Sequence, residues 1–234
     1  MIYEIKLMSK ESDMLETYIT NLKKSHMTPF IIFMMIYIGF FNVIGLFVSN
    51  VWNRVPIIIH IMIFIWIVSC LIIIKQDSYN KIKMNQYVAL RYLIVNVFAG
   101  YMQPIALSVG YVIESAYMHR DVINHWFVLQ LFIILSLIGT TLFSLNEFHI
   151  ILKKAKTWIN ILAVLFKILS FALILYLNFS LPIVKEENMF IWSVIIVLIV
   201  IDAFLIRSFF FYSLVVGTLN GDFEQPGNAS ISEE

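Results

Sequence analysis

Long apolar stretches alternate with short polar segments along this chain of 234 residues. A helix needs about 20 apolar residues to cross a hydrocarbon core of about 30 Å, and six stretches are long enough. The segments between them are too short to form a soluble domain. We therefore predict an all-α fold, a polytopic membrane bundle of six transmembrane helices. The predicted helices are 29–48, 55–74, 87–113, 126–145, 158–184 and 189–216.

The apolar pattern divides the chain into three parts. Residues 29–216 form the transmembrane domain, and residues 1–28 precede it as a cytoplasmic segment. Within that segment Met14, Tyr18 and Leu22 recur at helical spacing, which predicts a short amphipathic helix lying in the membrane interface. Residues 217–234 are polar and lack apolar periodicity, so we expect a disordered cytoplasmic tail.

The positions of the basic residues predict the orientation. Lysine is concentrated in the first segment, in the second loop and in the fourth loop, whereas each intervening loop has a single basic residue. Because basic residues favour the cytoplasmic side, both termini are predicted to be cytoplasmic. The residues compared are Lys6, Lys10, Lys23, Lys24, Lys75, Lys81, Lys83, Lys153, Lys154 and Lys156 on one side, and Arg54, Arg120 and Lys185 on the other.

Composition agrees with lipid as the surrounding solvent. Charged residues make up 13% of the chain, about half the roughly 25% typical of soluble domains. The formal net charge of +1 gives no reason to expect nucleic acid as a partner. The single cysteine, Cys70, excludes an intramolecular disulfide and a metal site built from several cysteines. Tryptophans near the helix ends suit the interfacial belt; they are Trp52, Trp126, Trp158 and Trp192.

Two charged residues inside the predicted helices are the strongest functional signal. An ionisable side chain at the centre of a membrane helix costs about 2.5–3.5 kcal/mol and normally faces protein or water. At about 1.5 Å per residue, Lys167 lies about 13 Å and Asp202 about 11 Å from the cytoplasmic boundary. The fifth and sixth helices are consecutive and antiparallel, so we predict a Lys167–Asp202 ion pair. The pair either fastens this hairpin or takes part in gating, substrate contact or ion coupling.

Polar residues on the fifth helix form a stripe around Lys167. Asn160, Ser170 and Asn178 lie within about 80° of it at 100° per residue, so this stripe faces protein or an aqueous path.

The third predicted helix has polar residues along its length. Arg91 lies about 9 Å inside the membrane at the helical rise. Asn96, Gly100 and Gln103 share one face, which indicates either helix packing with interhelical hydrogen bonds or a conduction path. Pro104 removes a backbone donor, so the helix is predicted to be kinked, tilted or broken.

Other polar residues favour packing roles. Asn42 lies between two glycines in the first helix, and Gln130, Thr141 and Ser144 share a face of the fourth. His60 is a candidate for a proton relay that titrates near neutral pH, with a packing role as the alternative.

The sequence contains no recognised catalytic, nucleotide-binding or metal-binding motif, so we predict a nonenzymatic protein without a cofactor. The first hypothesis is a permease-type transport component that moves a small solute, lipid or peptide. Its gating residues would be drawn from Lys167, Asp202, Asn96, Gln103, Arg91 and His60.

The expected partners of such a component are the lipid bilayer and either a homo-oligomer or a cytoplasmic ATPase. A protein partner would dock on the basic loops 75–86 and 146–157. These features are similar to those of small permease subunits of ABC exporters, a similarity of architecture that involves no residue motif. The alternative is a noncatalytic scaffold, sensor or protective protein. Either would reside in the cell membrane.

Overall fold

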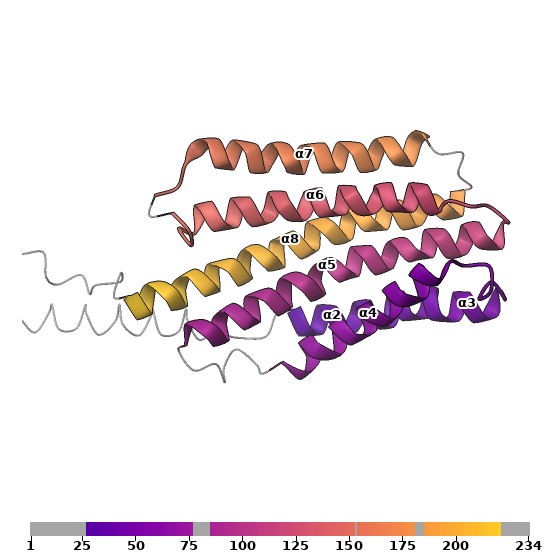
Figure 1. The fold of residues 1–234 in the computed structure, drawn as a ribbon, viewed down its shortest axis with the longest axis horizontal. Helices are drawn as coiled ribbons and strands as arrows, with labels where there is room; N and C mark the ends of the chain where they lie inside the picture. The colour runs from indigo at the N-terminus through magenta and orange to yellow at the C-terminus, as the bar shows by residue number, and fades with distance from the viewer. Residues whose placement is uncertain (1–26, 77–84, 153, 181–184, 221–234) are drawn as a thin grey trace, which may run out of the picture.

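A computed structural model describes residues 27–76, 85–152, 154–180 and 185–220, and in these residues it is helical with no strand (Figure 1). The elements are the α-helices α2 (Met27–Gly39), α3 (Gly45–Val48), α4 (Ile57–Lys75), α5 (Gln86–Tyr117), α6 (Ile123–Glu147), α7 (Thr157–Ser180) and α8 (Lys185–Asn220), with the π-helix η1 (Phe40–Ile44) between α2 and α3.

Six helical segments among the described residues are long and apolar enough to cross a membrane. The first consists of α2, η1 and α3 together, and the others are α4, α5, α6, α7 and most of α8. This confirms the predicted helical class and the six predicted positions, and it indicates a multi-pass membrane protein. The cytoplasmic location of the termini stays a prediction. The predicted interfacial helix and polar tail lie almost entirely outside the described residues.

Helix α5 is the centre of the bundle. Across an apolar stretch of 18 residues in each helix, 72% of the residues of α5 are buried, against 17% of those of α7. Helix α5 packs most extensively on α8 and also contacts α4, α6 and α2. Small residues allow the close approach. A methyl group on Gly100 would lie 3.3 Å from the side chains of Ile201 and Met27, so glycine fits the contact between α5, α8 and α2.

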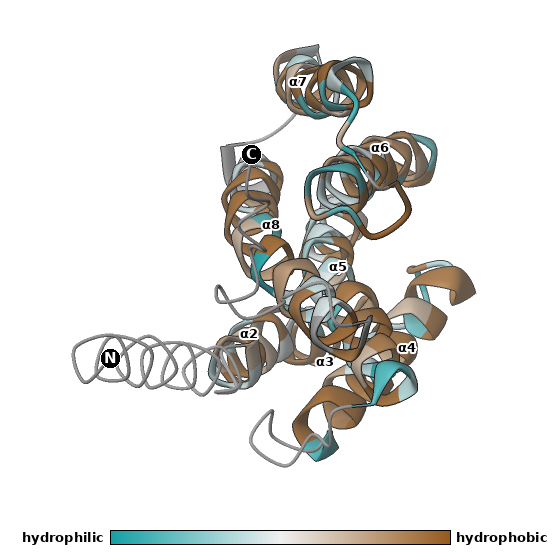
Figure 2. Cartoon of the chain, turned by 90° about the vertical axis from the view of Figure 1, so that its left-hand side faces the viewer, coloured by the Kyte–Doolittle hydropathy of each residue, from teal (hydrophilic) through white to brown (hydrophobic). Residues whose placement is uncertain are grey.

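Helices α6 and α7 form a hairpin at the edge of the bundle. Helix α7 packs along α6 and has few contacts with α8 (Figures 1 and 2). Asn146 fastens the connection between the two helices. Its side chain accepts a hydrogen bond from the backbone N–H of Lys156 at 2.9 Å and donates to the Lys156 carbonyl at 3.0 Å and to Asn160 at 2.7 Å.

The first membrane segment contains a π-helical turn that the sequence pattern does not predict. Asn42 lies in this turn and is fully buried. Its amide donates to the carbonyl of Ala106 on α5 at 2.5 Å. The packing role predicted for Asn42 is therefore confirmed, and the wider turn coincides with the contact between this segment and α5.

Pro104 lies inside α5, which continues through it as one helix. Of the predicted alternatives, a kinked, tilted or broken helix, the break does not occur. Proline still removes one backbone hydrogen bond, and the surrounding packing keeps this residue buried. The 32 residues of α5 extend about 48 Å at the helical rise, whereas the hydrocarbon core is about 30 Å thick. The helix therefore either tilts or extends beyond the hydrocarbon.

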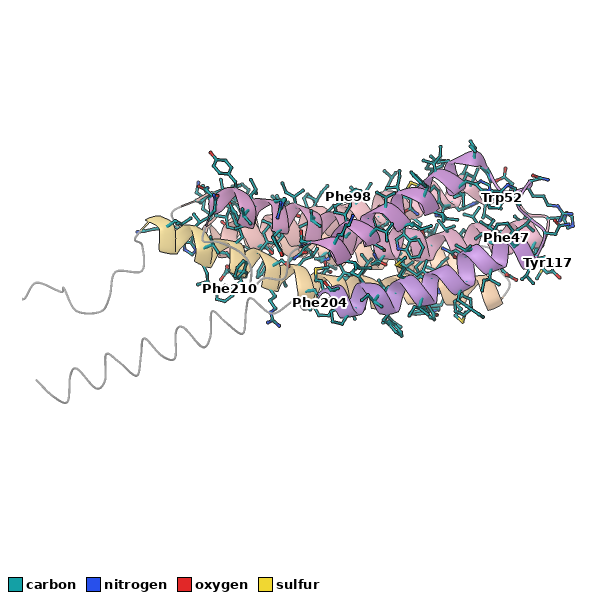
Figure 3. All side chains as sticks on the ribbon, turned by 90° about the horizontal axis from the view of Figure 1, so that it is seen from below. Phe47, Trp52, Phe98, Tyr117, Phe204 and Phe210 are labelled. Atoms are coloured by element: carbon teal, nitrogen blue, oxygen red, sulfur yellow. The ribbon has the colours of Figure 1, made fainter. Side chains whose placement is uncertain are left out.

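Aromatic side chains gather at one end of the bundle, where Phe47, Trp52 and Tyr117 are exposed (Figure 3). This arrangement suits an interfacial belt. Trp126 differs from the prediction because it is buried, with its indole N–H donating to the Ser108 hydroxyl at 2.9 Å. It joins α6 to α5 and does not face lipid.

Candidate functional site

Lys167 on α7 and Asp202 on α8 form an ion pair between Nζ and Oδ2, as predicted. Both residues lie near the middle of their helices and at matching levels. The side chains are 21% and 12% exposed, so the pair is largely enclosed by protein. Because α7 otherwise contacts α8 sparsely, this pair is a principal link between the two helices.

The second oxygen of the Asp202 carboxylate accepts two hydrogen bonds. The hydroxyl of Tyr101 on α5 donates to Oδ1 at 2.6 Å, and the hydroxyl of Thr140 on α6 donates to the same atom at 2.7 Å. A buried carboxylate is stabilised only when its oxygens are paired or hydrogen-bonded. Four helices, α5 to α8, therefore converge on Asp202.

The Lys167 ammonium has further partners besides the carboxylate. It donates to the hydroxyl of Ser136 on α6 and, at 3.4 Å, to the hydroxyl of Tyr101. Its nitrogen also lies 5.6 Å from the ring centroid of Phe171, one turn along α7, within the range of a cation–π interaction. We refer to Tyr101, Ser136, Thr140, Lys167 and Asp202 as the ion-pair cluster.

Gly139 allows the α7 backbone to approach α6 beside this cluster. A methyl group at this position would lie 2.9 Å from the Ala163 carbonyl oxygen and 3.3 Å from the backbone nitrogen of Lys167. Since backbone atoms cannot move aside as a flexible side chain can, only glycine fits without shifting α7. The close approach brings Lys167 within reach of Ser136 and Asp202.

The predicted polar stripe on α7 faces α6. Ser170 is buried and donates to the Phe132 carbonyl at 2.7 Å, and Asn160 donates to Glu147 Oε2 at 2.8 Å. Asn178 is also buried. Of the two expected surroundings, protein or an aqueous path, these hydrogen bonds show protein.

Gln103 and Asn96 lie on α5 outside the ion-pair cluster. Gln103 accepts a hydrogen bond from the Trp66 indole on α4 at 3.0 Å. Asn96 donates to the Ser208 hydroxyl on α8 at 3.0 Å and accepts from Gln76 at 3.1 Å. These five residues, the amide cluster, join α5 to α4 and α8 through uncharged groups.

Arg91 and His60 are not part of either cluster. Arg91 is exposed near the beginning of α5. His60 is half-buried in the first turns of α4, where its ring contacts Trp52 edge-on at a centroid distance of 4.4 Å and Nδ1 lies 3.3 Å from the Pro56 carbonyl. Of the six predicted residues, the structure places Lys167 and Asp202 in the ion-pair cluster, and Asn96 and Gln103 in the amide cluster.

Three members of the ion-pair cluster were not predicted from the sequence: Tyr101, Ser136 and Thr140. On the same helix the sequence pattern assigns Thr141 to a packing face, whereas it is the hydroxyl of Thr140 that bonds Asp202. Two signals could have found them. Tyrosine usually lies near the membrane interface, so Tyr101 at mid-helix was unusual. Ser136, Gly139 and Thr140 also form a run of small residues at helical spacing, typical of a close helix contact.

The arrangement holds two opposite charges inside the bundle and links four helices through them. Among residues 27–76, 85–152, 154–180 and 185–220, no three His, Cys, Asp or Glu side chains are grouped to hold a metal ion.

The second basic loop has Lys154 and Lys156 exposed. Most of loop 75–86 lies outside the described residues, so partner docking stays a prediction.

Comparison with known proteins gives one family and no characterised relative. No curated protein and no solved structure matches the chain significantly. A family model described as Domain of unknown function (DUF5079) matches residues 16–225, which include all six membrane segments. The chain belongs to this family of unknown function.

Proposed function

We propose that this chain is a transport component, a permease-type subunit that moves a small solute, lipid or peptide across the cell membrane. It contributes no catalytic step itself. The energy comes from a separate ATPase docked on the basic loops, or from an ion gradient. The observation that carries the proposal is the ion-pair cluster, which links the α6–α7 hairpin to α5 and α8 at membrane depth.

A charged link between these parts supports a functional role. Apolar residues of similar volume often stabilise a buried contact as well as an ion pair does. A charged contact is therefore not needed for packing alone, and intramembrane ion pairs commonly mark transport paths. Because α7 contacts α8 sparsely elsewhere, breaking and reforming Lys167–Asp202 would let the hairpin move relative to α8.

A second candidate is a noncatalytic scaffold, sensor or protective membrane protein. One observation favours it. Both oxygens of Asp202 and the ammonium of Lys167 have partners within the protein. A pair that is satisfied in this way can fasten the hairpin permanently, in which case the chain acts through a bound partner rather than by movement.

Purification of the full chain from native membranes in mild detergent tests the first candidate. We expect a nucleotide-binding subunit in constant proportion and ATP hydrolysis by the complex, or ion flux after reconstitution into proteoliposomes. The double variant Lys167→Met with Asp202→Leu keeps the contact apolar and should purify normally while losing that activity. A chain that purifies alone and shows no flux contradicts the transport proposal and leaves the second candidate. Activity that survives the double variant contradicts the role given to the ion pair.

A further inference from the structure

An apolar groove runs along the exposed side of α5, between α5 and α6. Its volume is about 390 Å³. Helix α5 provides Ile94, Phe98 and Tyr101, while Leu137 of α6 and Phe209 of α8 complete the wall. Ile94 and Phe98 are 58% and 50% exposed, so the groove is open at the side of the bundle.

The groove has the length of one lipid leaflet. Its α5 residues extend from Leu93 to Ile105, which corresponds to about 18 Å along the helix. One leaflet occupies about half of the 30 Å hydrocarbon core, or about 15 Å. An acyl chain lying parallel to α5 therefore fits the groove.

Arg91 lies at the cytoplasmic end of this groove in the predicted orientation. It precedes Phe98 by two helical turns and therefore shares its face of α5. The side chain is exposed. Tyr101 bonds Asp202, which lies about 11 Å from the predicted cytoplasmic boundary, and Arg91 precedes Tyr101 by ten residues, or about 15 Å along α5. Arg91 therefore lies at that boundary, beside the phosphate layer, and not about 9 Å inside the membrane as its place in the sequence suggests. The guanidinium group is suited to bidentate recognition of a phosphate.

We propose that this groove binds one anionic phospholipid of the cytoplasmic leaflet, with its phosphate on Arg91 and one acyl chain along Ile94, Phe98 and Tyr101. A lipid with net negative charge is favoured because no headgroup amine offsets its attraction to the guanidinium. Tyr101 connects this site to the ion-pair cluster. It lines the groove, and its hydroxyl donates to Asp202.

Lipid titration of the purified full chain tests this site. Native mass spectrometry would count phosphatidylglycerol and phosphatidylcholine molecules retained by the wild type, by Arg91→Gln and by Ile94→Trp. The wild type should retain phosphatidylglycerol preferentially. Arg91→Gln should reduce its affinity about tenfold, which corresponds to about 1.4 kcal/mol, and bring it close to that of phosphatidylcholine. Ile94→Trp fills the groove and should weaken retention of both lipids.

Two matched substitutions serve as controls. Lys156→Gln removes an exposed cation on the same predicted side, and Ile36→Trp enlarges an exposed residue on α2. Both should retain lipid as the wild type does. Equal retention of the two lipids by the wild type, or an unchanged preference in Arg91→Gln, overturns the proposal. Equal thermal stabilisation by inorganic phosphate and by phosphatidylglycerol also overturns it, because the acyl chain would then contribute nothing.

Discussion

The ion-pair cluster and the amide cluster both depend on α5 but fasten different parts of the molecule. Tyr101 connects α5 to a charged pair that holds the α6–α7 hairpin. Gln103 and Asn96 connect it to α4 and α8 through uncharged groups. Removing one partner of a buried ion pair leaves an uncompensated charge, whereas removing one neutral group leaves only uncharged groups without a hydrogen bond. The hairpin attachment should therefore be the more sensitive of the two.

The largest expected effect is that of removing one charge. Lys167→Met leaves the Asp202 carboxylate without its cation and should lower the free energy of unfolding by about 3–5 kcal/mol. Titration with SDS in detergent micelles measures this change. Lys154→Met removes an exposed lysine and should change stability by less than about 0.5 kcal/mol. A loss for Lys167→Met as small as that for Lys154→Met would contradict the greater sensitivity expected of the ion-pair cluster.

Removal of the Tyr101 hydroxyl should cause the second-largest loss of free energy of unfolding. Tyr101→Phe removes the 2.6 Å hydrogen bond to Asp202, and hydrogen bonds to charged groups contribute about 1.5–3 kcal/mol. The same titration measures the loss. Tyr176→Phe on α7, where the side chain is 69% exposed, is the control and should have little effect. A loss no greater than that of the control would mean that α5 is not fastened to the ion pair.

The third-largest loss of stability is expected from a methyl group at Gly139, where α6 and α7 approach closely. Gly139→Ala places a methyl group 2.9 Å from the Ala163 carbonyl, and overpacking of this kind costs about 1–3 kcal/mol. Gly39→Ala is the matched control because its nearest neighbour, Trp66, would lie at 3.8 Å. Thermal unfolding should show a lower midpoint for Gly139→Ala only. Equal midpoints would indicate that α7 can shift without penalty.

The smallest effect is expected in the amide cluster. Ser208→Ala removes the acceptor of the 3.0 Å hydrogen bond from Asn96. Interhelical hydrogen bonds in membrane proteins contribute about 0.6 kcal/mol on average, so the loss should be of this order. Ser193→Ala, at a half-buried serine of the same helix, provides the comparison in SDS titration. A loss as large as that of Lys167→Met would contradict the ranking of the two clusters.

The sequence predicted the membrane segments well because hydrocarbon imposes a length and an apolar composition on each helix. It also predicted the Lys167–Asp202 pair, since charges are rare at that depth and the two residues lie at equal depth. The prediction placed α7 beside α8 because consecutive helices are often neighbours. In the structure α7 packs mainly on α6.

The remaining partners depend on which helices meet, and that is decided by tertiary packing. Ser136 and Thr140 lie on α6, which occupies the space beside both α7 and α8. A helical pattern alone does not show that neighbour, so the sequence does not single out Ser136 and Thr140 as partners of the ion pair. The π-helical turn at Asn42 and the uninterrupted path through Pro104 likewise reflect contacts between helices.

Exchanging the two charges tests most directly whether Lys167 and Asp202 attach the hairpin. The variant Lys167→Asp with Asp202→Lys should recover a large part of the free energy of unfolding that either single substitution loses, because opposite charges again face each other. A double variant whose loss equals the sum of the two single losses would show that the residues do not interact and would contradict this account.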